Sequence, residues 1–162
     1  MKCQVLLLLG ILISNVSSLE LQSPGEGIEE TVIEGYILCK NCGEDTTVLN
    51  LIDNSRVSSS NRGLSNFTFG SKEILLQDLR NPRGINFKVL VTKRASCAKT
   101  SGWFSESSWF EGYAWKVCLC PSCKAHIGWM FEPIDLAAFN PLYPGSEGFY
   151  AIILDTTQIH FL

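Results

Sequence analysis

Two pairs of cysteines constrain the fold of this chain more than any other feature. C-K-N-C at residues 39–42 and C-P-S-C at residues 120–123 are both C-x-x-C motifs, and 77 residues lie between them. Each motif can present two thiolates to one side of a tetrahedral ion, with metal–sulfur distances of about 2.3 Å. Such an ion would connect an early hairpin to a late one and close a long loop of the unfolded chain. The predicted zinc ligands are Cys39, Cys42, Cys120 and Cys123.

The first 18 residues have the pattern of a secretory signal peptide. Lys2 is a short basic start, residues 5–13 (VLLLLGILI) form an apolar run too short to span a bilayer, and residues 16–18 (VSS) place small residues before a cleavage site. An uncleaved membrane anchor is the alternative. Cleavage would remove Cys3 and leave an exposed acidic lead-in at residues 19–33 and one domain at residues 34–162. The expected location is extracellular.

Disulfide bonds are the alternative use for the motif cysteines, because secreted chains with several cysteines are often held together by them. A bridge within one C-x-x-C motif is short and strained, although bridges between the two motifs are geometrically possible. C-P-S-C also resembles a thioredoxin-type dithiol, but that motif needs a βαβ setting, and residues 120–123 lie between two expected strands. We therefore favour a structural zinc ion.

Two further cysteines, Cys97 and Cys118, lie outside both motifs. In an oxidising compartment two remaining thiols most often pair, so we predict a Cys97–Cys118 disulfide. Two unrelated buried thiols are the alternative. Asn66 begins the sequon Asn-Phe-Thr in a polar segment, which predicts a glycosylation site on the surface.

The net charge argues against nucleic acid as a partner. The chain has 13 Lys and Arg residues against 16 Asp and Glu residues, a formal charge of −3. Without Lys2, 12 basic and 16 acidic residues leave −4. Nucleic-acid binders need a positive face, because attraction to phosphates supplies much of their affinity. The sequence has no basic cluster of that kind, nor one that would favour an anionic membrane.

Short β-branched or aromatic runs alternate with turn residues from Tyr36 onward, which is typical of an all-β domain. Asn-Pro-Arg-Gly at residues 81–84 is typical of a turn, and residues 133–140 could form one helical turn. The strand at the C-terminal end is expected to close the domain. The expected strands are residues 47–52, 67–70, 73–79, 85–93, 113–119, 126–132 and 149–154.

Three of the four tryptophans lie in residues 107–132, SSWFEGYAWKVCLCPSCKAHIGWMFE. Alternate side chains of a strand share a face. One strand then groups Tyr113, Trp115, Val117 and Leu119, and the next groups Ile127, Trp129 and Phe131. If these strands form a hairpin, Trp115 and Trp129 can be neighbours across it. A rigid knuckle beside indoles can hold a cavity open for a flat or compact ligand, although an aromatic core without a ligand is the alternative.

Several motifs in this region resemble those of the cereblon-type thalidomide-binding domain, or CULT domain, which also occurs alone in secreted animal proteins. They are W-F-x-G-Y-A-W at residues 109–115, C-x-x-C at 120–123 and H-I-G-W at 126–129, with C-x-x-C at 39–42 and N-P-x-G at 81–84 at compatible distances. The resemblance covers about residues 34–155. It implies a β-tent fold, in which two antiparallel sheets are pinned by zinc at their junction.

The resemblance also implies a ligand pocket with walls of Trp109, Trp115 and Trp129 and a base of Phe131. In the family this pocket accepts the glutarimide ring of thalidomide-like drugs and related cyclic imides. The matching positions imply that the backbone carbonyl of Ser107 accepts the imide N–H and that the backbone N–H of Trp109 donates to an imide carbonyl. Asn81 would lie on the covering loop, and Glu106 near the rim.

This sequence departs from cereblon at three points. Ser107 stands where cereblon has histidine, which a backbone contact tolerates. Cys118 replaces a small residue, which fits an additional extracellular disulfide. The protease-like domain and the adaptor-binding helices are missing, so no ubiquitin-ligase adaptor is expected as a partner.

The expected function is therefore a secreted, non-enzymatic binding module for a cyclic imide or a uracil-like ring, with C-terminal cyclic imides on damaged proteins as another candidate partner. A redox enzyme is one alternative, since the scaffold is similar to that of methionine sulfoxide reductases, and it requires Cys97 or Cys118 to be a free thiol. A cage for a quaternary ammonium ligand is another, with Glu106, Glu111 or Glu132 as its carboxylate. His126 is expected to make structural hydrogen bonds and His160 to lie in the tail.

Overall fold

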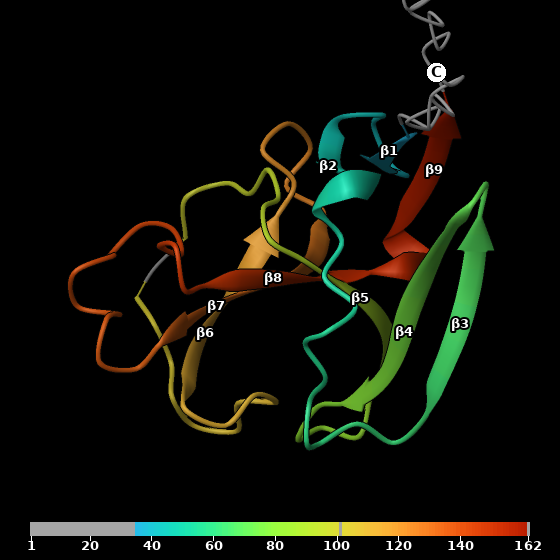
Figure 1. Ribbon diagram of the computed structural model, residues 1–162. Helices are drawn as coiled ribbons and strands as arrows, with labels where there is room; N and C mark the ends of the chain where they lie inside the picture. Colours follow the sequence, from blue (N-terminus) through green and yellow to red (C-terminus); the bar gives the residue numbers. More distant parts are fainter. Residues whose placement is uncertain (1–34, 101, 162) are drawn as a thin grey trace, which may run out of the picture. The chain divides into compact units, whose positions relative to one another are not determined.

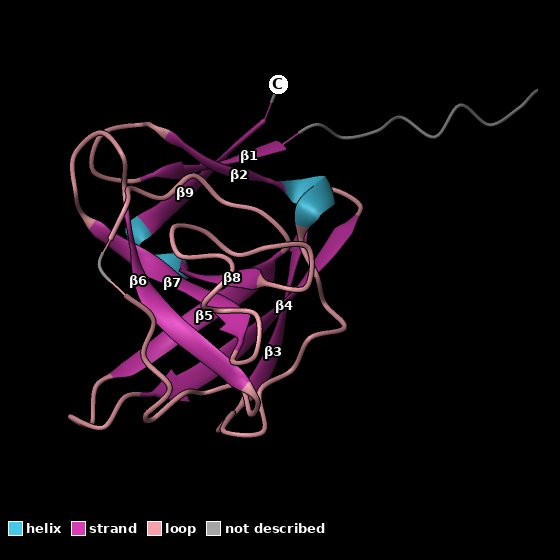
Figure 2. Cartoon of the chain, turned by 90° about the vertical axis from the view of Figure 1, so that its left-hand side faces the viewer, coloured by secondary structure: helices cyan, strands magenta, loops and turns pink. Residues whose placement is uncertain are grey.

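The structure, a computed structural model, describes residues 35–100 and 102–161, all of which belong to the unit Val32–Leu162. The expected signal peptide (residues 1–18), Cys3 and the expected lead-in (residues 19–33) lie outside the described residues. Strands joined by loops dominate the described part, and its only helices are two short 3₁₀ turns (Figure 2). None of the helices in this part has the length and hydropathy of a membrane span.

The strands form two antiparallel sheets, as the resemblance to the CULT domain implies. A three-stranded sheet has the order β2-β1-β9, and a six-stranded sheet has the order β3-β4-β5-β8-β7-β6 (Figure 1). The strands are β1 (Gly35–Cys39), β2 (Asp45–Val48), β3 (Leu64–Phe69), β4 (Lys72–Arg80), β5 (Asn86–Thr92), β6 (Tyr113–Leu119), β7 (His126–Pro133), β8 (Phe149–Ile153) and β9 (Thr157–Phe161).

Each face of the six-stranded sheet carries its own apolar cluster. One cluster includes Ile37 of β1 together with Met130 and Ile152, so it lies between the two sheets. The other cluster includes Trp129, Ala151 and the three neighbouring phenylalanines Phe110, Phe131 and Phe149. Because β8 contributes side chains to both clusters, all five of its residues are buried, which explains its unbroken apolar sequence FYAII.

The C-terminal segment differs from the prediction. Residues 149–154 do not close the domain, because the 3₁₀ turn Leu154–Thr156 leads from β8 into a further strand, β9. β9 pairs along β1 from Gly35 to Cys39 and completes the three-stranded sheet. His160 is therefore a strand residue opposite Tyr36 rather than part of a tail. The expected strand at residues 47–52 is also only half correct, since Leu49–Leu51 form a 3₁₀ turn.

The hairpin of β6 and β7 forms as predicted, but its register contains one irregularity. Cys118 pairs with Gly128 and Leu119 with His126, so Ile127 is an extra residue in β7. This bulge turns Ile127 into the cluster between the sheets, away from the cluster that holds Trp129 and Phe131. The prediction that Ile127 shares their face was therefore wrong. Trp115 lies opposite Phe131, and Trp129 opposite Val117, so the two tryptophans are diagonal rather than direct partners.

Candidate functional site

The two C-x-x-C motifs fold into turns with the same hydrogen-bond pattern. In the first, Cys39 N donates to Glu44 O and Gly43 N donates to Cys39 O, both at 2.8 Å. In the second, Cys120 N donates to Ala125 O at 2.8 Å, and Lys124 N donates to Cys120 O at 3.0 Å. The fifth residue of each turn has a positive φ, 78° at Gly43 and 61° at Lys124. The repeated geometry directs two thiols from each hairpin toward the other.

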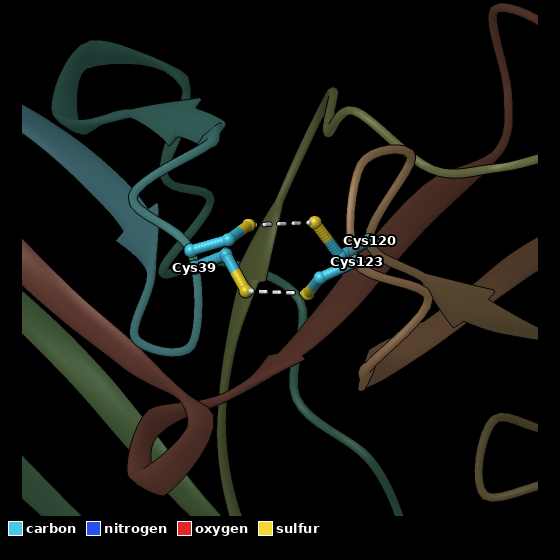
Figure 3. Close-up of side chains that lie close together, drawn as sticks. Cys39, Cys120 and Cys123 are labelled. Carbon is cyan, nitrogen blue, oxygen red and sulfur yellow. Dashed lines mark hydrogen bonds between the residues drawn. The ribbon is translucent and has the colours of Figure 1, made fainter.

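The four thiols meet between the two sheets. Figure 3 shows Cys39 approaching from the β1–β2 turn, with Cys120 and Cys123 facing it from the β6–β7 turn. The Sγ atoms of Cys39 and Cys123 are 3.7 Å apart, those of Cys42 and Cys120 are 3.6 Å apart, and all four lie within 4.8 Å of one another. A tetrahedral ion with metal–sulfur bonds of about 2.3 Å requires sulfur separations of about 3.8 Å. The four cysteines therefore fit a tetrahedral metal ion.

The surroundings of these thiols favour a thiolate at Cys123. A hydrogen bond with the Asn41 side chain, helped by the backbone N–H of Ala125, lowers the pKa of Cys123 to about 6. Burial raises the pKa of Cys39 from its ordinary value. Because a thiolate is the metal-binding form of cysteine, Asn41 prepares one ligand of the cluster.

A cavity of about 660 Å³ opens beside Trp129. Its walls come from four segments, namely the 81–87 region, the 104–109 loop, β6 and β7. All the residues that the sequence assigned to a ligand pocket lie in these walls: Asn81, Glu106, Ser107, Trp109, Trp115, Trp129 and Phe131.

Hydrogen bonds fix the orientation of two of the indoles. Trp109 Nε1 donates to Arg80 O, and Trp115 Nε1 donates to Glu106 O, both at 2.9 Å. Trp109 and Trp129 meet edge to face, with ring centroids 4.6 Å apart. Because the indole N–H groups of Trp109 and Trp115 have backbone partners, these two side chains contribute mainly apolar ring surface to the cavity wall.

The backbone at Ser107 has an unusual conformation, with φ at 58°. Ser107 is exposed, whereas Trp109 is only 8% exposed. Across residues 35–100 and 102–161, neither the Ser107 carbonyl nor the Trp109 backbone N–H takes part in a hydrogen bond. Trp109 uses its own carbonyl to accept a hydrogen bond from the Ser58 hydroxyl. One backbone acceptor and one backbone donor are thus unused at the cavity.

Asn81 closes a turn at the edge of the cavity. Its side-chain Oδ1 accepts from Ile85 N at 2.9 Å, and its backbone carbonyl accepts from Gly84 N at the same distance. Gly84 has φ of 85°, a conformation that glycine adopts without strain. Asn81 therefore lies on a well-defined turn at the edge of the cavity.

Phe87 and His126 also line the cavity, and the sequence analysis did not assign them to it. Both rings meet Trp129 edge to face, with centroids at 4.9 Å for Phe87 and 4.5 Å for His126. His126 Nε2 lies 2.9 Å from Gly128 O, which matches the expected structural hydrogen bond. Burial lowers the pKa of His126, although this hydrogen bond acts in the opposite direction. The bulge at Ile127 places His126 here, and no local sequence pattern indicates it.

Side chains on the opposite face of β6 do not line the cavity. The structure contains the predicted disulfide between Cys97 and Cys118. Lys116 is 1% exposed, donates to Pro141 O at 2.6 Å, and lies 4.4 Å from the centroid of Trp103. The fourth tryptophan therefore packs away from the cavity.

The carboxylates considered for a cation cage lie in different places. Glu106 is exposed and lines the cavity. Glu132 is fully buried and accepts hydrogen bonds from the Asn140 side chain at 2.6 Å and from Gly145 N at 2.8 Å. Glu111 is exposed and is not part of the cavity wall.

Curated relatives of this chain share one name. Cereblon from Danio rerio is 30% identical over 110 residues, which cover 67% of this chain and 22% of that protein. Cereblon from Gallus gallus is 42% identical over 52 residues (32% of this chain, 12% of that protein). This chain is similar to cereblon. It spans about a fifth of the Danio rerio protein, and no protein-family model matches it.

Proposed function

We propose that this protein is a secreted, non-enzymatic binding module whose CULT-type domain accepts a cyclic imide, such as glutarimide, or a uracil-like ring. The observation that carries the proposal is that seven residues assigned from sequence, on four separate segments, line one aromatic cavity. Similarity to cereblon supports the same kind of domain. Secretion rests on the N-terminal sequence pattern.

The cavity suits a flat ring with an acceptor–donor–acceptor edge. The ring's CH₂ groups would leave water against the indole faces, which contributes about 25 cal/mol per Å² of apolar surface. The imide N–H would donate to the Ser107 carbonyl, and the Trp109 N–H would donate to an imide carbonyl. Because both backbone groups are unused, binding would add hydrogen bonds without breaking internal ones. A ligand of this size should bind with about micromolar affinity.

Zinc is the ion that we assign to the four-cysteine cluster, because it combines tetrahedral geometry with a preference for thiolates. Its role would be structural, since four protein ligands leave no open position for a substrate. The ion would join the three-stranded sheet to the hairpin that carries Trp115 and Trp129.

The alternatives fit the structure less well. A redox enzyme would need a free thiol at Cys97 or Cys118, and these two residues form a disulfide. A cage for a quaternary ammonium ion gains one carboxylate from Glu106, but Arg83 lines the same cavity and opposes a cation. The adaptor and ligase roles of full-length cereblon are outside the proposal, because this chain spans only about a fifth of the Danio rerio protein. C-terminal cyclic imides on damaged proteins remain candidate ligands.

The test is a titration of the secreted protein with glutarimide, uracil and choline, followed by tryptophan fluorescence. We expect saturable binding of an imide or uracil ring with a Kd of about micromolar and much weaker binding of choline. Trp115→Ala should weaken imide binding at least about tenfold, whereas Trp103→Phe should leave it unchanged because Trp103 packs on the other face. A preference for choline, or no binding of either ring, would overturn the proposal.

A further inference from the structure

A second cavity, of about 480 Å³, adjoins the aromatic one. The two cavities share Asn81, Pro82, Ser107 and Trp109 in their walls. The rest of the second cavity is polar and includes Ser60, Arg62, Arg80 and Ser108. A ligand whose ring occupies the aromatic cavity could therefore extend a substituent directly into the polar one.

The two arginines at this second cavity have no acidic partner. No carboxylate among the described residues lies within 4 Å of either guanidinium. The ion pairs in the described part of the chain join Arg56 to Asp53 and Lys88 to Asp78. Arg80 donates from Nε to Gly84 O at 3.0 Å, which fixes one edge of its guanidinium. The chain as a whole has a net charge of −3, so two arginines without acidic partners at one cavity form a local positive site. Such a site favours an anion.

Hydrogen bonds join the main chains of the two arginines to the residues around the ring pocket. Trp109 Nε1 donates to Arg80 O at 2.9 Å, which joins the shared indole wall to the main chain of Arg80. The Arg62 backbone N–H donates to Asp78 O at 2.9 Å, which anchors the Arg62 main chain to β4. The Ser58 hydroxyl donates to Trp109 O and joins the 58–62 segment to the same wall.

We propose that the second cavity binds an anionic group, a carboxylate or a phosphate, carried by the same ligand whose ring occupies the aromatic cavity. The inference rests on the proposed function and narrows it, because the natural ligand would be an acidic imide or a nucleotide-like molecule rather than a neutral ring. The arginines would supply charge-assisted hydrogen bonds, and the hydroxyls of Ser60 and Ser108 could add neutral ones.

The test compares matched pairs of ligands that differ only in charge. In the carboxylate arm, 3-aminoglutarimide acylated with succinate is compared with its terminal amide, with linkers of increasing length. In the phosphate arm, uridine 5′-monophosphate is compared with uridine. We expect the anionic member of at least one pair to bind about three- to tenfold more tightly at low salt, and the advantage to shrink as salt is added.

Variants of Arg62 separate this subsite from the ring pocket. Arg62→Gln should remove most of the advantage of the anionic ligand, and Arg62→Glu should reverse it, while binding of the neutral ring stays the same. Arg94→Gln, which lines a different cavity, is the matched control and should change neither. Equal affinity for both members of every pair would overturn the inference and leave the proposed function intact. Failure of every ring to bind would reject the proposed function, and the inference with it.

Discussion

Ser107 would contribute to the proposed binding site through its backbone. A non-glycine residue with a positive φ costs about 1–2 kcal/mol, and Ser107 has φ of 58° at the edge of the aromatic cavity. The surrounding hydrogen bonds maintain this conformation, including the one from Trp115 Nε1 to the carbonyl of the preceding residue, Glu106. We interpret the cost as the consequence of leaving the Ser107 carbonyl free for a ligand.

Substitutions at Ser107 test this interpretation. Ser107→Gly keeps the positive φ and the carbonyl, so it should bind glutarimide as well as the parent protein does. Ser107→Pro forces φ to a negative value and should weaken binding at least about tenfold. Calorimetric titration measures both affinities, and a thermal melt checks that the exposed substitution has not unfolded the protein. Unchanged affinity in Ser107→Pro would show that the backbone of this residue does not contact the ligand.

At the scale of elements, the hairpin of β6 and β7 carries both candidate metal ligands and walls of the aromatic cavity. Its turn carries Cys120 and Cys123, and its two strands carry Trp115 and Trp129. The bulge at Ile127 then directs His126 toward the pocket. β7 approaches β8 so closely at Gly128 that a Cβ there would lie 2.2 Å from Ala151 O.

Gly128→Ala should therefore separate β7 from β8. We expect a loss of about 3 kcal/mol in the free energy of unfolding, the size of a serious overpacking defect, together with weaker imide binding. Urea denaturation measures the loss. Gly102→Ala is the control, because nothing lies within 4 Å of a Cβ at Gly102, and it should change stability by less than about 0.5 kcal/mol. Similar stability for the two variants would contradict the close packing at Gly128.

The sequence predicts the hairpin of β6 and β7 well, because residues close together in the chain specify both its strands and its turn. Alternation in residues 113–119 and a C-x-x-C turn specify two paired strands. Runs of four to nine residues, separated by turn residues, specify most of the remaining sheet. β9 was missed because its sequence, TQIHF, has little apolar character, and its pairing with β1 connects the two ends of the described chain. The sequence did not identify Phe87 and His126 as residues of the cavity. Phe87 reaches Trp129 from β5, which is distant in sequence, and the bulge in β7 places His126 there.

At the scale of the whole described domain, the four-cysteine cluster connects the two sheets. Cys39 and Cys42 belong to the hairpin of the three-stranded sheet, and Cys120 and Cys123 to the hairpin of the six-stranded sheet. An ion at the cluster would therefore restrain the unfolded chain across 77 intervening residues.

We expect one zinc ion per purified chain, measured by atomic absorption. Cys42→Ala should lose the ion and about 4 kcal/mol of stability, as expected for removing a crosslink across a loop of this length. The double variant Cys97→Ala and Cys118→Ala is the control, because it removes the other crosslink and should retain the zinc ion. A parent protein that contains no metal, and whose stability does not change on addition of a chelator, would contradict the assignment.

The central claim is that the aromatic cavity recognises the edge of an imide through one backbone acceptor and one backbone donor. The most direct measurement compares the affinities of glutarimide and N-methylglutarimide by calorimetric titration. Methylation removes the only N–H of the ring and places a methyl group against the Ser107 carbonyl, so we predict binding weaker by at least about tenfold. Equal affinities for the two rings would show that the cavity does not recognise an imide edge.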